Sequence, residues 1–455
     1  MAFENTSQNI KGTGVMCPAL IVAAPSSGTG KTTITAAIAR YHRNQGKKVT
    51  IFKVGPDFID PMILRQASGE LVYQLDLWLV GEQGCQELLY KAAKNSDLIL
   101  IEGVMGLFDG TPSSADLAET FNIPVLGIID ASAMAQTFAA VAFGLANYRP
   151  AMPFSGVIAN RVNTPRHKEI LENCLPDDIR FYGRIPKDES ITLPRRHLGL
   201  VQAQELTDID TQLDQAASHI AETGLVELPA AVEFFTCEAT ETYKADGALA
   251  GTRIIIVKDK AFSFIYAANI AFLEETGAEL VYCSALTDSE LPAGDVLYIP
   301  GGYPELYAEQ LTANKSFITS IIAFAQSNKT IIAECGGMLY LLDQLTDLEE
   351  KEFSMVGLLP GKAVMQKKVA AIGSQQVTLP LQGTETLASN IMRGHSYHYS
   401  SAEIALEPIS QTKHHPTERL GEFVYQHGNI LASYMHWYFQ SNPELTVKLF
   451  TRVGS

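Results

Sequence analysis

The sequence predicts an α/β protein built from two tandem three-layer α/β domains. Short β-branched runs alternate with helical patterns in both halves, which is typical of parallel sheets covered by helices. The alternation weakens between residues 226 and 252, where Pro, Gly, Ala and acidic residues mix without a sustained period. At 455 residues the chain also exceeds the usual size of a single domain.

We therefore expect a polar N-terminal tail over 1–16, a first domain over 17–225, a linker over 226–252 and a second domain over 253–455. The strands expected in the first domain are Ala19–Ala24, Val49–Lys53, Leu98–Glu102, Val125–Ile129 and Gly156–Asn160. Those expected in the second are Arg253–Val257, Glu279–Tyr282, Val296–Ile299, Thr330–Glu334, Met392–Ser400 and Ile430–Met435. Because ligands of such sheets bind at the carboxyl ends of strands, the residues that follow these runs are the first candidates.

Composition excludes several classes of function. With 34 basic and 50 acidic side chains, the formal charge of −16 argues against nucleic acid or an anionic membrane as a partner. The six cysteines are scattered without metal-ligand spacing, so we expect the reduced thiols of a cytoplasmic protein. We see neither a signal-peptide core nor an apolar run of the roughly 18 residues that a membrane-spanning helix needs. The sequence does not set the oligomeric state, and a homodimer stays open.

Residues 20–40, LIVAAPSSGTGKTTITAAIAR, carry the strongest local pattern of the first half. A strand runs into a small-residue turn and then into a helix that begins near Lys31. Gly28 and Gly30 let successive backbone N–H groups point inward and bind phosphate oxygens. Lys31 can reach the outer phosphates of a nucleotide, and Thr32 can offer its hydroxyl to Mg²⁺. Pro25 replaces the first glycine of the strict pattern, so the loop is a variant. The residues expected to contact the nucleotide are Gly28, Thr29, Gly30, Lys31, Thr32 and Thr33.

Four acidic residues follow the ends of two expected strands. Asp57 and Asp60 come after the second strand, whereas Glu102 ends the third and Asp109 lies in the Gly-rich loop beyond it. A single such acid would be an ordinary turn or helix-capping residue. Four of them at strand ends, downstream of a phosphate loop, favour metal and substrate binding, and Mg²⁺ needs only one or two carboxylates beside the phosphates. Individual roles are not separable, and we take Thr32, Asp57 and Glu102 as metal ligands, with Asp60 and Asp109 as substrate candidates.

The segment TIIAECGGMLYLLDQL, residues 330–345, predicts a buried strand that turns sharply into a helix, with Cys335 at the turn. A thiolate at a helix N-terminus is stabilised, so we expect a lowered pKa for Cys335. Upstream, VLYIPGGYPEL is another strand that ends in glycines, and the N–H groups of Gly301 and Gly302 could donate to an oxyanion. Most lone cysteines are inert core residues. The strand–Cys–Gly–Gly–helix pattern is nevertheless that of a nucleophile elbow, and His436 at a later strand end supplies a candidate base.

The phosphate loop is followed in order by KVGPDFIDP, EGVMGLFDG, PGGYPEL, AECGGMLYL, RGHSYHYS and MHWYF. Together these motifs resemble the cobyrinic acid a,c-diamide synthase family, over almost the whole chain from about Cys17 to Phe439. The first domain is similar to the dethiobiotin-synthetase type of P-loop fold. The second is similar to class I glutamine amidotransferase domains.

This resemblance implies a reaction shared between two sites in cobalamin biosynthesis. Its substrates would be ATP and a corrinoid polycarboxylate, cobyrinic acid, with glutamine or ammonia as nitrogen donor. Cys335, activated by His436, would attack the side-chain amide of glutamine and release ammonia. In the first domain ATP and Mg²⁺ would convert a corrinoid carboxylate to an acyl phosphate, which ammonia would displace, first at the c and then at the a side chain. Phosphorylation is needed because a carboxylate has no usable leaving group at neutral pH.

Basic residues could hold the carboxylates of the corrinoid. The candidates are Arg161, Arg195, Arg196 and His197. A solvated surface is an equally good interpretation of this basic cluster. The chain departs from the resemblance at one place: many class I amidotransferases have Glu two residues after the histidine, where this chain has Tyr438. What orients His436 is therefore open.

Several alternatives stay open at this point. Within enzymes they are the hydrogenobyrinic acid (metal-free corrin) and nickel-sirohydrochlorin versions of the reaction, while GPDFIDP and GGYPEL argue against cobyric acid synthase. The sequence does not separate a cobalt-containing from a metal-free ring. A P-loop nucleotide switch with a non-catalytic amidotransferase-like domain would not need Cys335 with His436. A standalone glutaminase would not need the intact SGTGKTT loop.

Overall fold

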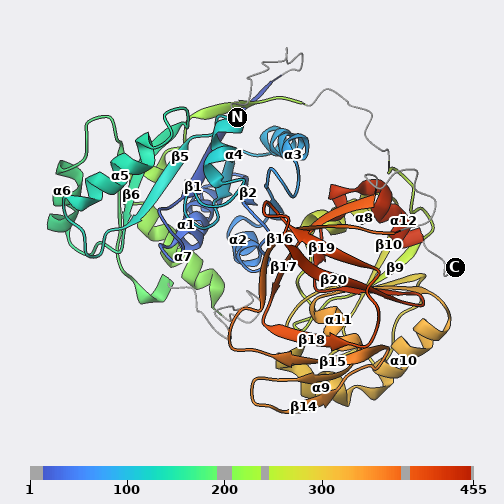
Figure 1. Cartoon of the computed structure of the whole chain (residues 1–455). Coiled ribbons are helices and arrows are strands. Elements are labelled where there is room, and N and C mark those ends of the chain that lie inside the picture. The colour runs from blue at the N-terminus through green and yellow to red at the C-terminus, as the bar shows by residue number, and fades with distance from the viewer. Residues whose placement is uncertain (1–13, 192–207, 237–244, 381–389, 452–455) are drawn as a thin grey trace. The chain divides into compact units, whose positions relative to one another are not determined.

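The computed structural model describes residues 14–191, 208–236, 245–380 and 390–451. The chain forms two compact units, Met1–Thr242 and Tyr243–Ser455, and each is described by itself (Figure 1). Across the described ranges, no helix combines the length and the apolar character required to cross a membrane.

The first unit is built on an eight-stranded sheet. The strands are β1 (Val15–Ala23), β2 (Val49–Lys53), β3 (Tyr73–Gln74), β4 (Leu98–Glu102), β5 (Val125–Asp130), β6 (Phe154–Asn160), β7 (Phe181–Ile185) and β8 (Ala231–Phe234). Their order is β3-β2-β4-β1-β5-β6-β7, all parallel, and β8 pairs with β1. The carboxyl ends of β2, β4 and β1 therefore lie side by side, so the residues that follow them can form one site.

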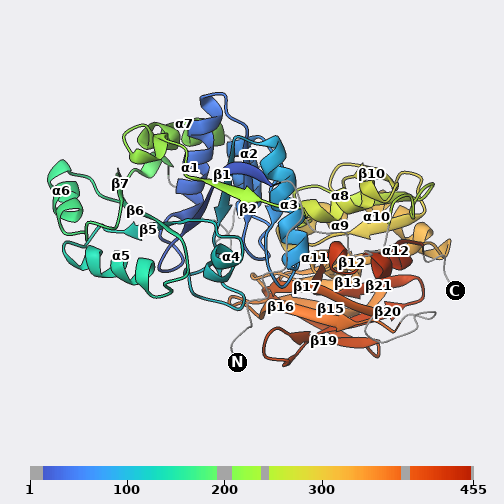
Figure 2. The same cartoon turned by 90° about the horizontal axis from the view of Figure 1, so that it is seen from above.

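Helices cover both faces of this sheet. They are α1 (Lys31–Asn44), α2 (Asp60–Ser68), α3 (Glu82–Asn95), α4 (Ser114–Thr120), α5 (Thr137–Asn147), α6 (Pro165–Asn173) and α7 (Ile209–Ile220). Alternate residues of β1 enter two separate cores: Ile21 packs with the cluster of α3, α4 and α5, and Val22 with that of α1, α2 and α7. Figure 2 shows α1, α2 and α7 on one side of the sheet and α4 and α5 on the other. This is the three-layer arrangement predicted for the first domain.

The boundaries of the first unit differ from those expected. Strand β8 lies within the expected linker and pairs antiparallel with the start of β1, with Phe234 opposite Val15 and Ala231 opposite Pro18. Strand β1 accordingly begins inside the expected polar tail. The contact joins two segments far apart in the sequence, and neither has a long enough local pattern to reveal it. Leu249, also in the expected linker, is buried in a core of the second unit.

The second unit contains a ten-stranded and a four-stranded sheet. The larger has the order β10-β9-β11-β12-β21-β20-β19-β16-β17-β22 and the smaller β14-β13-β15-β18. The larger sheet comprises β9 (Arg253–Val257), β10 (Glu279–Cys283), β11 (Val296–Ile299), β12 (Thr330–Glu334), β16 (Ala371–Thr378), β17 (Ile391–His398), β19 (Ser410–His414), β20 (Leu420–His427), β21 (Ile430–Ser433) and β22 (His436–Trp437). The smaller comprises β13 (Leu342–Thr346), β14 (Glu352–Ser354), β15 (Leu359–Met365) and β18 (Ser400–Ile404). Strands β10, β9, β11, β12 and β21 are parallel, and the remaining pairs of the larger sheet are antiparallel.

Helices α8 (Ala267–Glu275), α9 (Ala308–Ala313), α10 (Lys315–Gln326), α11 (Gly336–Leu341) and α12 (Pro443–Thr451) complete this unit. Alternate residues of β9 again enter two cores, Ile255 in one and Ile254 in the other. The predicted fold class, two tandem α/β domains, is confirmed. One expected strand, Met392–Ser400, divides at Tyr399 into β17 and β18, which belong to different sheets.

Candidate functional site

The phosphate loop of the first unit joins β1 to α1 in the conformation its glycines were predicted to allow. Gly28 and Gly30 have φ angles of 79° and 99°, a region that favours glycine. Asn160, at the end of β6, donates through Nδ2 to the Thr29 carbonyl at 2.7 Å. A Cβ on Gly30 would lie 2.5 Å from that same nitrogen, so the close approach itself requires glycine. The loop is thus fixed from a neighbouring strand, with the N-terminus of α1 beneath it.

Lys31 lies across this loop. Its ammonium donates to the carbonyls of Ser26 at 3.0 Å and of Met105 at 2.6 Å. Burial lowers the pKa of Lys31, and the nearby Lys53 lowers it further. Met105 belongs to the loop after β4, so Lys31 ties that loop to the phosphate loop. A phosphate entering between them would find an ammonium already held in place.

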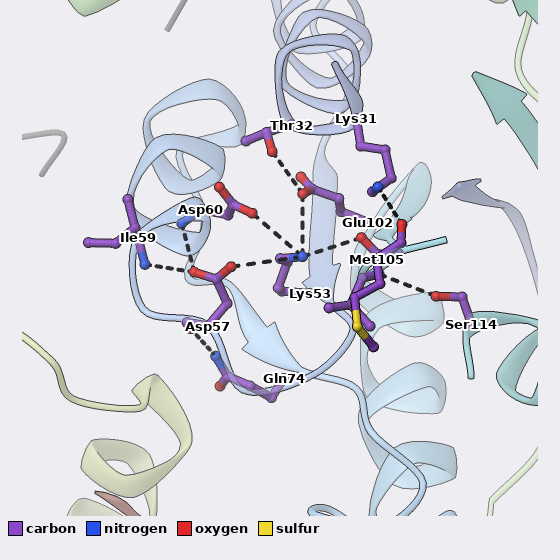
Figure 3. A network of polar contacts seen from close by, with 12 residues as sticks. Lys31, Thr32, Lys53, Asp57, Ile59, Asp60, Gln74, Glu102, Met105 and Ser114 are labelled. Atoms are coloured by element: carbon purple, nitrogen blue, oxygen red, sulfur yellow. Dashed lines mark hydrogen bonds and ion pairs between the residues drawn. The ribbon is translucent and has the colours of Figure 1, made fainter. Parts of the chain in front are cut away.

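A second ammonium, that of Lys53, lies among three of the four predicted acids (Figure 3). Lys53 ends β2 opposite Glu102 in β4, and its Nζ is 3.4 Å from Glu102, 3.5 Å from Asp60 and 4.0 Å from Asp57. The Thr32 hydroxyl donates to Oε1 of Glu102 at 2.9 Å. The structure therefore brings together Thr32, Asp57, Asp60 and Glu102, as the sequence predicted, around a lysine that the sequence analysis did not identify.

Charge explains the arrangement of this cluster. Burial alone would lower the pKa of Lys53, but Glu102, Asp60 and Asp57 raise it above its usual value. Burial and the neighbouring Asp60 raise the pKa of Asp57 to about 7, and burial and Glu102 raise that of Asp60. Over the described ranges, no three His, Cys, Asp or Glu side chains form a metal-ligand group. The carboxylates converge on an ammonium instead.

The remaining predicted residues of the first unit lie at different places. Asp109 is exposed and accepts from the Gly106 N–H at 3.0 Å, so it shapes the loop after β4 and does not contact Lys53. Arg161 pairs with Asp130 and donates to the Gly28 carbonyl at 3.2 Å. Arg195, Arg196 and His197 fall outside the residues that the structure describes.

A cavity of about 690 Å³ opens beside the phosphate loop, at the carboxyl ends of β6 and β7. Its walls include Gly30, Thr33, Asn160, Arg161 and Lys187. Arg161 therefore lines this cavity and also contacts the phosphate loop through the Gly28 carbonyl. Thr33, which directly follows the loop, lines the cavity as well. Pockets of this size suit drug-sized molecules.

In the second unit, Cys335 lies at the sharp turn that was predicted between β12 and α11. Its φ and ψ are 46° and −109°, a strained conformation for a residue with a side chain. The Cys335 N–H donates to the Ser433 carbonyl at 2.7 Å, so the neighbouring β21 holds the turn. A Cβ on Gly337 would lie 2.2 Å from the Ile299 carbonyl oxygen, which requires glycine at this position. Backbone strain held by surrounding structure is typical of a nucleophile elbow.

The two glycines after β11 lie between the elbow and the candidate base. A Cβ on Gly301 would be 2.1 Å from Cε1 of His436, so this glycine packs directly on the imidazole. A Cβ on Gly336, next to Cys335, would be 2.9 Å from the backbone nitrogen of Gly302. The turn therefore contacts both the nucleophile segment and His436, and it places the Gly302 N–H beside Gly336, where an oxyanion could be bound.

The position expected for a third carboxylate is occupied by an aromatic residue. Tyr438 is fully buried, and its ring packs edge-on against Tyr266 with centroids 5.6 Å apart. A carboxylate nonetheless faces the imidazole: Oε2 of Glu334, the last residue of β12, lies 3.8 Å from Nδ1 of His436. Glu334 was not identified from the sequence. The only signal available was a charged residue at the end of an otherwise apolar strand.

The resting thiol differs from expectation. Burial raises the pKa of Cys335 instead of lowering it, because the thiol is 5% exposed and Glu305 lies near. Helix α11 has only six residues, so its N-terminal field is weak compared with this burial. Burial also lowers the pKa of His436 to about 3. The prediction of a lowered thiol pKa was wrong, because burial of Cys335 outweighs the field of this short helix.

Comparison with known proteins identifies the family. A family model described as the CobQ/CobB/MinD/ParA nucleotide binding domain matches residues 20–201, and one described as the CobB/CobQ-like glutamine amidotransferase domain matches residues 253–444. A hydrogenobyrinate a,c-diamide synthase of Stutzerimonas stutzeri is 52% identical over 94% of this chain and 97% of its own length. The chain belongs to the a,c-diamide synthase family.

Two further members of the a,c-diamide synthase family extend the comparison. A hydrogenobyrinate a,c-diamide synthase of Pseudomonas aeruginosa is 49% identical over 96% of this chain and 98% of its own. A cobyrinate a,c-diamide synthase of Herminiimonas arsenicoxydans is 43% identical over 95% of this chain and 96% of its own. Membership confirms the resemblance inferred from the motifs, and with it the prediction of a nucleotide-binding, glutamine-using ligase. Both described sites lie within the residues matched by the two family models.

Proposed function

We propose that this enzyme uses ATP and glutamine to convert the a and c carboxylates of hydrogenobyrinic acid to carboxamides. The proposal rests on the presence of two arrangements in one chain. In the second unit, the strained and buried Cys335 lies beside a glycine turn that packs on His436. In the first unit, a phosphate loop lies beside the side chains of Thr32, Asp57, Asp60 and Glu102. The first arrangement suits release of ammonia from glutamine. The second suits activation of a carboxylate by a nucleotide.

In the first unit, the phosphates of ATP would lie in the loop formed by Gly28, Thr29, Gly30, Lys31, Thr32 and Thr33. The cavity beside this loop would hold the nucleoside, which moves the proposed role of Arg161 from the corrin to the nucleotide. Lys31 would stabilise charge on the transferred phosphoryl group as the acyl phosphate forms. Asp60 and Asp109 stay candidates for the substrate side, with Arg195, Arg196 and His197 proposed from the sequence alone.

Mg²⁺ is the cofactor implied by this chemistry, and the residues present fit it. Oε1 of Glu102 is engaged by Thr32 and Lys53, whereas its buried Oε2 accepts no hydrogen bond from any residue that the structure describes. Hard oxygen atoms of this kind suit Mg²⁺, which keeps several waters. Thr32, Asp57 and Glu102 would hold the ion, and the bound ion would neutralise phosphate charge.

In the second unit, Cys335 would attack the side-chain carbonyl of glutamine while His436 takes the thiol proton. The N–H groups of Gly301 and Gly302 would donate to the oxygen that becomes negatively charged. His436 would then return a proton to the departing ammonia, leaving a glutamyl thioester that water hydrolyses. The ammonia would displace phosphate from the activated carboxylate in the other unit.

The choice of ring follows from the relatives. Those at 52% and 49% identity are named for hydrogenobyrinate, and the one at 43% for cobyrinate. This ranking supports the metal-free ring as substrate. Mass spectrometry of products formed with ATP and glutamine from hydrogenobyrinic acid, cobyrinic acid and nickel-sirohydrochlorin tests it. We expect two successive amidations, each lowering the mass by about one unit, fastest with hydrogenobyrinic acid.

A pair of serine variants tests the assignment of the thiol. Cys335→Ser should abolish amidation with glutamine while leaving amidation with added ammonia. Cys283→Ser is the matched control, because Cys283 has the same 5% exposure but lies at the end of β10, away from the elbow. Glutamine-dependent product from Cys335→Ser would refute the thiol assignment, and absence of ATP consumption by the wild type would refute the ligase.

A further inference from the structure

Glu334 has an environment that its place in the sequence does not explain. It ends β12 immediately before Cys335, and its side chain is 2% exposed. Oε2 lies 3.8 Å from Nδ1 of His436 and accepts from the Tyr298 hydroxyl at 2.9 Å. Oε1 accepts from the Trp437 N–H at 3.2 Å. A buried carboxylate fixed by two donors thus faces the imidazole.

We propose that Glu334 is the positioning residue of the thiol site: it orients His436 through Nδ1 and stabilises the imidazolium that forms when the ring takes the Cys335 proton. The proposal rests on the glutaminase half of the proposed function. In many class I amidotransferases this role belongs to a Glu two residues after the histidine, and Tyr438 occupies that position in this chain. We assign the role to Glu334, the residue before Cys335.

The physical need for such a group comes from burial. His436 is 1% exposed, so solvent does not stabilise a charge on its ring. The cost of a buried charge falls when an opposite charge lies within a few ångströms and is itself hydrogen-bonded. Glu334 is hydrogen-bonded by Tyr298 and Trp437. Burial raises its pKa to about 8 and these two donors oppose that rise, so the charge that stabilises His436 forms as the pH passes this value. A separation of 3.8 Å is longer than a hydrogen bond, and catalytic contacts of this kind commonly shorten once substrate is bound.

Orientation follows from the same contacts. The Trp437 N–H that donates to Glu334 belongs to the residue after His436, so one carboxylate contacts both the ring and its adjoining backbone. With Nδ1 facing Glu334, Nε2 is the nitrogen left to take the thiol proton. A Cβ on Gly301 would clash with the ring, so the turn restrains the imidazole from the other side.

Other ionisable groups also act on this pair. Those acting on Cys335 are Glu305 in the short 3₁₀ turn Pro304–Tyr307 and Glu422 in β20, and those acting on His436 are His395 and His398 in β17. The two histidines disfavour a charge on His436. Among the residues described, Glu334 is the carboxylate within 4 Å of the imidazole, so it is the group that offsets them.

A purely structural role is the competing explanation, since Glu334 links β12 to Tyr298 in β11 and to β22. Glu334→Gln distinguishes the structural role from the positioning role, because glutamine keeps the shape of the side chain and removes its negative charge. Tyr298→Phe is the matched control, because it removes a hydrogen bond from the same carboxylate and keeps the charge. Glu334→Asp keeps the charge with a shorter reach and tests rescue.

The experiment uses the full-length enzyme with ATP, Mg²⁺ and hydrogenobyrinic acid. For Glu334→Gln we expect the glutamine-dependent kcat to fall about a hundredfold, with little change in KM for glutamine and an unchanged ammonia-dependent rate. Tyr298→Phe should lose about tenfold at most, and Glu334→Asp should be faster than Glu334→Gln. The glutamine-dependent kcat of the wild type should also rise as the pH passes the Glu334 pKa of about 8, because the carboxylate forms there, and this step should be absent in Glu334→Gln.

Three results are decisive. A glutamine-dependent kcat of Glu334→Gln near that of the wild type, or a rise in this rate near pH 8 that persists in Glu334→Gln, overturns the proposal. Parallel loss of the glutamine- and ammonia-dependent rates, matched by Tyr298→Phe, also overturns it in favour of a structural role. Cys335→Ser distinguishes this failure from failure of the proposed function: if that variant still uses glutamine, the thiol chemistry itself is wrong, whatever Glu334 does.

Discussion

Two ionisable residues that lie within the candidate sites, Lys53 and Glu334, each end a buried strand. Each could have been noticed as a charge that closes an apolar run, since such a charge is costly unless it is paired. Their partners could not have been predicted, because Lys53 meets Glu102 across a strand pair and Glu334 meets His436 from a segment about a hundred residues away in sequence. The sharp turn at Cys335, the phosphate-loop conformation and the positions of Asp57, Asp60 and Glu102 at strand ends were predictable because their motifs are local.

The Lys53 ammonium neutralises part of the charge of the acidic cluster. Lys53→Met removes the cation from among Asp57, Asp60 and Glu102, so the three carboxylates repel one another. We expect the free energy of unfolding to fall by about 3 kcal/mol, measured by urea denaturation. Without the ammonium, the cluster should also bind free Mn²⁺ at least about fivefold more tightly in the absence of nucleotide, measured by electron paramagnetic resonance.

Lys48→Met is the control for Lys53→Met. Lys48 pairs with Glu70 at 3.7 Å, and both side chains are exposed, so its loss should cost less than about 1 kcal/mol. Equal destabilisation by the two variants, or weaker Mn²⁺ binding by Lys53→Met, would contradict the view that Lys53 acts as a counter-ion within the acidic cluster.

Among the secondary-structure elements, most parallel strands were predictable, although β3 and β7 were missed, whereas β17 was the antiparallel strand of the larger sheet that the sequence indicated. Strands such as β4 and β12 are buried on both faces, so they read as continuous apolar runs. Strand β16, AIGSQQVT, and strand β20, LGEFVYQH, intersperse Gly and polar residues among the apolar ones, so neither forms a continuous apolar run. Tyr399 separates β17 from β18 at a point where the alternating pattern of the sequence continues without a break.

The contact of β17 with β22 is tight enough to test. Gly394 faces the His436 backbone so closely that a Cβ would lie 2.0 Å from the His436 carbonyl oxygen. Gly394→Ala should therefore destabilise the protein by about 1–3 kcal/mol and, by displacing His436, lower glutamine-dependent amidation while sparing the ammonia-dependent rate. Urea denaturation and the two rate assays measure this.

Gly144→Ala is the matched control for the glycine substitution. Gly144 lies inside α5, and a Cβ there would meet nothing within 4 Å. Alanine is the better helix former, so this change should stabilise the protein by about 0.5–1 kcal/mol. A neutral effect of Gly394→Ala would show that β17 and β22 can separate without cost.

At the scale of the whole molecule, the division into two units was predictable because the alternating pattern weakens near the boundary. The two ends of the first unit could not be predicted from the sequence, because β1 and β8 pair across more than two hundred intervening residues. The proposed function divides along the same line: nitrogen release belongs to one unit and carboxylate activation to the other.

Lys31→Ala tests this division. Without the ammonium at the phosphate loop, amidation should stop with either glutamine or ammonia as nitrogen source. Release of glutamate from glutamine, measured separately, should persist at its basal rate, because Cys335 and His436 belong to the other unit. Turnover with ammonia at the wild-type rate would contradict the assigned role of the loop. Arg43→Ala, on the same helix but bonded to the Gln66 carbonyl, is the control that should retain both activities.

The enclosure of Cys335 also bears on how long the enzyme survives oxidants. Peroxide attacks the thiolate form, and only where it can reach the sulfur. A neutral thiol held almost out of contact with solvent offers neither condition. A preparation left in air without a reductant should therefore keep the Cys335 thiol reduced.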